Sequence, residues 1–203
     1  MIELTMNPRP VGRPSIFNKE EAKKIACHLF WQHGYEETSL TDLTQAMGIN
    51  RSSFYWAFES KEALFHACVE TYMKEELKFI PAALAQPNIK DCITELLSNS
   101  VHLMTMHTPA RGCLIVQGII NCSDQNQSIA NYLKQKRMQL ENLVRKRVQQ
   151  AQVKQEIKSG QSAVDITKTV MTLYCGLSIQ AASGTNQKEL INVAKLILKM
   201  IDI

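Results

Sequence analysis

Apolar side chains recur at intervals of three and four residues along most of this 203-residue chain, and that spacing constrains the fold more than any other feature. It is the spacing of an amphipathic α-helix, because residues three and four apart share one face. The few glycines and prolines sit at plausible helix ends, and no segment shows the alternation of a half-buried β-strand. The sequence therefore predicts an all-α protein.

The predicted helices follow a Pro-containing segment, residues 1–17, which is expected to be a flexible N-terminal arm. Asn18 and Glu21 form a capping-box pattern at the start of the first helix, and Gly34 ends it. Thr38 or Ser39 caps the second helix. The remaining helices are expected over 51–57, onward from 61, and over 88–107, 110–122, 125–156, 162–183 and 187–202.

Two short predicted helices are separated only by Gly48-Ile49-Asn50, which is the spacing of a helix-turn-helix. The sides that face each other are apolar, while the outer side of the second helix carries Arg51, Ser52, Tyr55 and Trp56. Such a face offers hydrogen-bond donors and flat rings to a major groove. A purely structural helical bundle is the alternative, but aromatic rings are usually buried in one. The pattern predicts a DNA-binding domain over 18–60, followed by a second domain over 61–203.

The same region resembles the TetR/AcrR family of bacterial regulators. The likeness is carried by GYEETSL (34–40), AMGINRSSFYWAF (46–58) and SKEALF (60–65), and more weakly by RGCLIVQG (111–118) and GLSIQAASG (176–184). It implies a ligand-responsive repressor that binds a near-palindromic operator as a homodimer and is released by a small-molecule inducer; a transcriptional activator is the alternative. The resemblance also departs from the family at Ala57, where many members carry histidine.

The resemblance assigns DNA contacts to nine positions. Arg51 and Ser52 match base-reading positions, and Arg51 is suited to pair bidentately with guanine. Lys61 lies at a helix N-terminus, whose amides also attract phosphate. Arg13 matches an arm that enters the minor groove. The full set is Arg13, Ser39, Thr41, Arg51, Ser52, Ser53, Tyr55, Trp56 and Lys61.

Net charge does not identify the DNA-binding part. Residues 1–78 contain 9 Lys and Arg against 11 Asp and Glu, whereas residues 125–160 contain 8 against 2. The basic side chains of 125–160 do not share one face and alternate with an apolar stripe, so a solvated outer face is favoured over a second nucleic-acid site. The placement of individual side chains therefore has to account for DNA binding.

The last two helices are expected to form a four-helix dimer interface with a second copy, as the resemblance implies; an ordinary monomer core is the alternative. The residues considered for it are Ile166, Val170, Leu173, Tyr174, Leu177, Ala181, Leu190, Val193, Ala194, Ile197 and Ile201. A small-molecule inducer of unknown identity is expected to bind among the fourth to eighth helices. The candidates for contacting it, each of which is also a candidate for simple core packing, are Phe65, Cys68, His102, Met106, Cys113, Gln117, Ile120 and Tyr174.

Six scattered cysteines without a close CxxC pair fit reduced thiols in the cytoplasm better than a disulfide frame or zinc site. Cys113 is a candidate redox or electrophile sensor, since Arg111 and a helix start near Pro109 would lower its pKa; the alternative is a buried apolar residue. His102 and His107 lack a metal-ligand spacing. No cofactor, enzyme motif or membrane-spanning segment is predicted.

Overall fold

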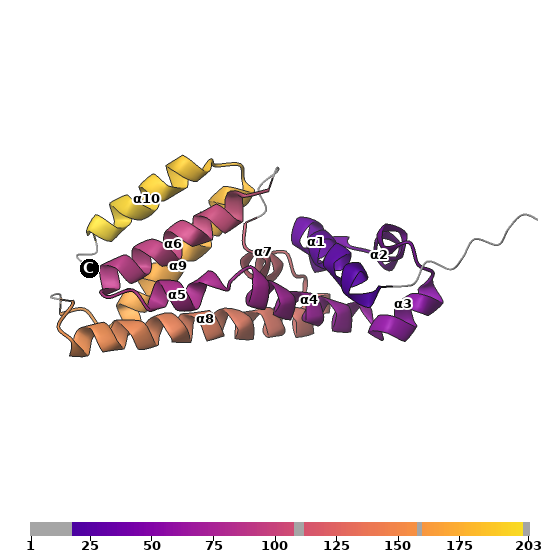
Figure 1. Ribbon diagram of the computed structural model, residues 1–203, viewed down its shortest axis with the longest axis horizontal. Coiled ribbons are helices and arrows are strands. Elements are labelled where there is room, and N and C mark those ends of the chain that lie inside the picture. The colour runs from indigo at the N-terminus through magenta and orange to yellow at the C-terminus, as the bar shows by residue number, and fades with distance from the viewer. Residues whose placement is uncertain (1–17, 108–111, 158–159, 201–203) are drawn as a thin grey trace, which may run out of the picture.

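The computed structural model describes residues 18–107, 112–157 and 160–200, and within these ranges helices are the only regular secondary structure, which confirms the predicted all-α class (Figure 1). In chain order they are α1 (Lys19–Glu37), α2 (Leu40–Met47), α3 (Arg51–Phe58), α4 (Lys61–Glu75), α5 (Phe79–Leu84), α6 (Ile89–Thr105), α7 (Leu114–Ile120), the 3-10 turn η1 (Asp124–Asn126), α8 (Gln127–Val153), α9 (Ala163–Ala182) and α10 (Gln187–Met200). The N-terminal arm lies outside the described residues.

The molecule is elongated, with α1, α2 and α3 at one end and the C-terminal helices at the other (Figure 1). Helix α4 lies between the two parts and packs along α1, while the long α8 runs along one side. In the C-terminal part, α6 contacts α5, α9 and α10. Helix α4 is therefore a direct physical link between the helix-turn-helix and the larger bundle. Of the helices described here, none is both long enough and apolar enough to cross a lipid bilayer.

Some helix boundaries differ from the predictions. The helix predicted over 110–122 begins only at Leu114, because Gly112 has a left-handed backbone (φ 66°) and Cys113 is extended. The short α5 was not predicted; Pro81 lies in its first turn, where a proline removes no helical hydrogen bond. Ser39, and not Thr38, caps α2.

Candidate nucleic-acid interface and ligand cavity

The turn between α2 and α3 is fixed by two caps and one glycine. The Ser39 hydroxyl accepts the Asp42 N–H (3.1 Å), and the Asp42 carboxylate accepts the Ser39 N–H (2.8 Å). Asn50 caps α3 by accepting the Ser53 N–H (2.8 Å). Gly48 has φ 66° and ψ 32°, a conformation that costs residues with a side chain about 1–2 kcal/mol. These local interactions hold α2 and α3 in the helix-turn-helix arrangement.

Helix α3 presents an aromatic and basic face to solvent. Phe54, Ala57 and Phe58 are buried against the rest of the domain. On the opposite side, the Trp56 side chain is 84% exposed and Tyr55 is 52% exposed, beside exposed Arg51 and Ser52. Large aromatic side chains exposed to this extent indicate a binding surface.

Two further predicted DNA contacts lie on α2 next to this face. The Arg51 guanidinium donates to the Thr41 hydroxyl (3.4 Å), which bridges the start of α3 to the start of α2 on their exposed side. Ser39 is also exposed, although its hydroxyl oxygen serves the cap of α2. The half-buried Ser53 lies in the first turn of α3. The structure thus brings Thr41 and Arg51 into contact, and it leaves Ser39, Ser52, Tyr55 and Trp56 exposed and Ser53 half-buried.

Lys61 is held at the N-terminus of α4 by an aromatic ring that the sequence did not suggest. Its Nζ lies 4.3 Å from the centre of the Tyr35 ring, and burial lowers the pKa of the Lys61 amine. Tyr35 in turn contacts the buried Phe65 (5.0 Å between ring centres). Ser60 caps α4 by accepting the Ala63 N–H (3.0 Å), which leaves other first-turn amides available for an anion. Arg13 lies outside the described residues.

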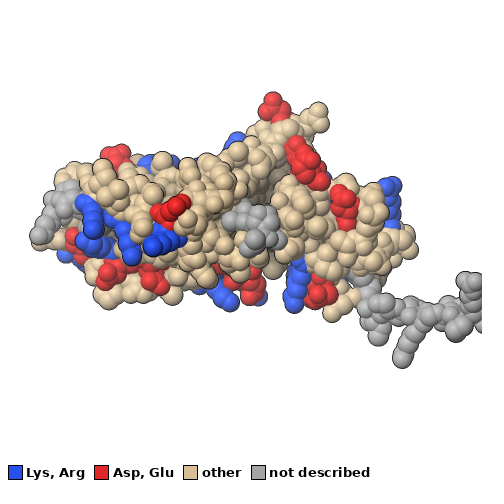
Figure 2. All heavy atoms as spheres, turned by 90° about the horizontal axis from the view of Figure 1, so that it is seen from above, with Lys and Arg blue, Asp and Glu red and all other residues tan. Residues whose placement is uncertain are grey.

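The surface around these helices is not uniformly basic. In α1, Lys23 pairs with Glu20 (2.7 Å) and Lys24 with Glu21 (3.9 Å). On the face shown in Figure 2, acidic and basic side chains are interspersed with uncharged ones over the end that holds the N-terminal helices, and a larger basic group lies at the opposite end. The N-terminal end of this face therefore offers no broad basic field.

A cavity of about 640 Å³ lies in the C-terminal bundle, between α4, α5, α7, α8 and α9. This volume is within the range of about 300–1,000 Å³ that small-molecule sites occupy. Its apolar lining is formed by Met73, Leu77, Ile80, Pro81, Ile115, Val116, Leu140, Leu143 and Tyr174. The cavity therefore has the size and the apolar lining of a ligand site.

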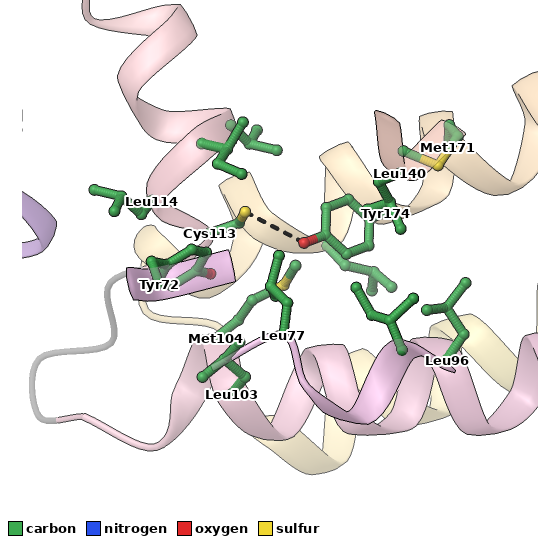
Figure 3. Close-up of a cluster of buried hydrophobic side chains, with 14 of the residues drawn as sticks. Tyr72, Leu77, Leu96, Leu103, Met104, Cys113, Leu114, Leu140, Met171 and Tyr174 are labelled. Carbon is green, nitrogen blue, oxygen red and sulfur yellow. Dashed lines mark hydrogen bonds between the residues drawn. The ribbon is translucent and has the colours of Figure 1, made fainter. Parts of the chain in front are cut away.

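Cys113 and Tyr174 are the two predicted ligand residues that line this cavity. The Tyr174 hydroxyl donates to the Cys113 thiol (3.2 Å), and the Tyr72 ring lies on the other side of the same thiol (Figure 3). Burial raises the pKa of both phenols well above the ordinary value, so both stay protonated. Cys113 is almost fully buried, which favours a packing role over the sensing alternative. Arg111 lies outside the described residues.

The other six predicted ligand residues are not in this cavity. Phe65 packs against Phe30 and Tyr35, and the Cys68 thiol faces the Lys23 carbonyl of α1 (3.7 Å). The side chains of His102, Met106 and Ile120 are exposed. The Gln117 amide donates to the Ser178 carbonyl (3.2 Å). Helical spacing identified apolar faces, but it does not say which neighbouring helix each face meets.

The cavity residues that the sequence did not single out come mainly from the end of α4 and from α8. Its basic lining is formed by Lys74, Lys78, Lys136, Arg137 and Lys146. Three of these residues, Lys136, Arg137 and Lys146, belong to the basic segment 125–160, for which the sequence favours a solvated outer face.

Several hydrogen bonds connect the helix-turn-helix part to the bundle. The Trp31 indole N–H in α1 donates to the Gly112 carbonyl (3.0 Å). The Glu36 carboxylate accepts the Ser123 N–H and the Asn126 side-chain amide (3.0 Å). On α4, Glu70 accepts the Tyr132 hydroxyl of α8 (2.7 Å) and pairs with Lys136. These contacts join the bundle to the DNA-binding end through both α1 and α4.

The outer side of α10 is apolar and uncovered in the single chain. Leu190, Ala194 and Leu198 face the core, whereas Val193 (45%), Leu196 (60%) and Met200 (76%) are exposed. On α9, the residues considered for a dimer interface are buried within the chain itself, so they form monomer core; these are Ile166, Val170, Leu173, Tyr174, Leu177 and Ala181. The exposed apolar residues of α9 are Val164 and Ile179. Ile201 lies outside the described residues.

Comparison with known proteins places this architecture among bacterial regulators. The sequence-family model described as "Bacterial regulatory proteins, tetR family" matches residues 24–68, which run from α1 into α4. The HTH-type transcriptional repressor ComR of Escherichia coli (strain K12) is 28% identical over 191 residues, covering 93% of this chain and 91% of ComR.

Two solved structures extend the likeness over almost the whole chain. A putative TetR transcriptional regulator from Rhodococcus sp. RHA1 is 33% identical, with a TM-score of 0.62, over 90% of this chain and 98% of that one. A cysteine mutant of the TetR family regulator CifR, solved in complex with 26-bp double-strand operator DNA, is 28% identical with a TM-score of 0.84, over 92% of this chain and 98% of that one. These relatives are regulators and not enzymes. The present chain belongs to the TetR family of bacterial transcriptional regulators.

Proposed function

We propose that this regulator binds a near-palindromic operator as a homodimer, represses transcription there, and is released when a small molecule enters the cavity between α4 and α8. The observation that carries the DNA-binding part is the exposed α3 face, which presents Arg51, Tyr55 and Trp56 to solvent. Such a face fits a major groove, with Arg51 reading a base edge. The CifR mutant of the same fold was solved on operator DNA.

The dimer part of the proposal rests on α10. Its two apolar sides require two partners, and the chain supplies one of them. A second copy related by a two-fold axis would cover Val193, Leu196 and Met200 with its own α9 and α10. This arrangement would leave the two α3 helices to meet half-sites about 34–36 Å apart.

Release would follow from the position of the cavity. Met73 lies in the last turns of α4 and Leu77 just beyond it, while the opposite wall is α8. Glu70 ties the same two helices together through Tyr132 and Lys136. A ligand that separates α4 from α8 would tilt α4 and alter the spacing of the recognition helices. It acts only if it binds the tilted arrangement more tightly.

Arg51→Ala is expected to relax sequence preference by about 1–3 kcal/mol at one base position of each half-site, because a bidentate pair with guanine is lost. The measurement is fluorescence anisotropy on an operator recovered by selection from random duplexes, with each position substituted in turn. Lys90→Ala, which removes an exposed cation from the far end of the bundle, should leave all affinities unchanged. Unaltered selectivity in the Arg51 variant would remove this residue from the base-reading set.

Operator affinity is expected to depend only moderately on salt. Two cations of α1, Lys23 and Lys24, are already paired with glutamates, so few phosphates are expected to be neutralised and few counterions released. A plot of log K against log[salt] should have a slope clearly shallower than about −10, the value of a protein with many phosphate contacts. A slope that steep would show that the described cations understate the electrostatic contact.

A further inference from the structure

The polar lining of the cavity between α4 and α8 has only one sign of charge. Five basic side chains line it, and no Asp or Glu does; these are Lys74, Lys78, Lys136, Arg137 and Lys146. Deeper in the cavity the lining is apolar, with Leu77, Ile115, Val116, Leu140 and Tyr174. A molecule that fills this space therefore meets buried apolar side chains and cationic groups.

Three of the five cations are paired with carboxylates that lie outside the lining. Lys136 pairs with Glu70, Arg137 with Glu141 (3.5 Å) and Lys74 with Glu75 (3.8 Å). Glu141 is in addition shared with Arg145 (3.0 Å) and Lys168 (2.6 Å), so it does not fully neutralise Arg137. The cations that already have partners therefore still leave the cavity surroundings positive.

Lys78 and Lys146 make no ion pair with any residue that the structure describes. They lie on different walls, Lys78 between α4 and α5 and Lys146 on α8. Both are exposed, so their long side chains are free to reach a bound group at the rim. Two unneutralised ammonium groups from different walls of the same cavity are suited to an anionic group.

We infer that this cavity binds an amphipathic anion, with an apolar body against Leu77 and Leu140 and one carboxylate, or a similar anionic group, between Lys78 and Lys146. The inference rests on the proposed function for the place of the ligand and adds its chemical class. Burial of the apolar body supplies most of the affinity. The charge of the rim decides between ligands, since it attracts an anion, leaves an alcohol unaffected and repels a cation.

The inference is tested with three probes that share one alkyl chain and differ in the head group: octanoate, octan-1-ol and octyltrimethylammonium, each below its micellar concentration. Binding to the full-length protein is measured by isothermal titration calorimetry without DNA. We expect octanoate to bind most tightly and octyltrimethylammonium most weakly. The affinity for octanoate should fall as salt screens the rim, while that for octan-1-ol should not.

The variant Lys78→Gln/Lys146→Gln should lose about tenfold in affinity for octanoate, the effect of two partly exposed charge contacts at the upper end of their usual range. Its affinity for octan-1-ol should stay the same, which also shows that the cavity is still folded. The control is Lys90→Gln/Lys154→Gln, which removes the same charge from exposed positions outside the cavity. It should retain the wild-type preference.

The inference would be overturned if the wild-type protein bound octan-1-ol or octyltrimethylammonium as tightly as octanoate or more tightly, or did not bind octanoate. It would also be overturned if both double variants lost the same affinity for octanoate. None of these results tests operator binding, which is measured separately with the Arg51 variant. Conversely, a protein that prefers octanoate but is not released from its operator by any cavity ligand would refute the proposed release and leave the ligand class standing.

Discussion

Val193→Asp/Leu196→Asp is expected to turn the regulator into a folded monomer and to weaken its binding to a full operator by about a thousandfold. Both side chains are about half exposed on the outer side of α10, so the single chain loses little packing when they change. In a two-fold dimer each aspartate would be buried close to its own copy. Burial of unpaired like charges costs far more than an apolar interface of this kind gains.

The size of the effect on DNA follows from linking two half-sites. When one α3 is bound, the second is held near its own half-site at a high effective concentration, which raises affinity by about 10²–10⁴ over a single module. A monomer loses this factor but keeps the contacts of one half-site. The double variant should therefore bind full and half operators with equal affinity, whereas the parent protein should strongly prefer the full operator.

Light scattering after size exclusion gives the mass of each variant, and anisotropy gives its affinity for full and half operators. The control is Met138→Asp/Val153→Asp, which adds two aspartates at exposed apolar positions of α8; it should remain dimeric. Helical circular dichroism confirms that both proteins are folded. A double variant that stays dimeric with full operator affinity would show that the two copies meet elsewhere.

The helix-turn-helix could be predicted from the sequence because its determinants are local. Ser39 and Asn50 cap helices within three residues of themselves, and Gly48 adopts the positive φ expected for a helix-ending glycine. The apolar side of α3 is also set by its own spacing, since Phe54 and Phe58 are buried. Such features do not depend on which distant segment packs nearby.

The cavity could not be predicted in the same way, because its walls come from helices far apart in the chain. Met106 and Ile120 have apolar side chains near helix ends, but about half of each is exposed and neither lines the cavity. Cys113 and Tyr174 reach one another across 61 positions in the chain, which no periodicity reveals. The spacing of α9 likewise shows an apolar side without showing whether it meets its own chain or a second copy.

Gly112 lies at a junction where three parts of the molecule meet, and its environment leads to the last prediction. Its carbonyl accepts the Trp31 indole N–H of the DNA-binding part. The next residue, Cys113, donates its N–H to the Ser178 hydroxyl of α9 (2.8 Å). A Cβ at position 112 would lie 2.6 Å from the Ser178 carbonyl oxygen, a backbone atom that cannot move aside without shifting α9.

Gly112→Ala is therefore expected to lower the free energy of unfolding by about 3 kcal/mol or more, through a positive φ and a steric clash together. Gly48→Ala is a matched control, since Gly48 has the same φ of 66° but nothing within 4 Å of its Cβ position. It should lose only about 1 kcal/mol, the conformational cost less the gain from a stiffer unfolded chain. Urea unfolding at one protein concentration measures both. Equal losses of stability in the two variants would mean that α9 shifts at this junction at no cost in free energy. Because the clash pushes α9 away from Gly112, whose carbonyl accepts the Trp31 N–H, Gly112→Ala should also uncouple ligand binding from operator release.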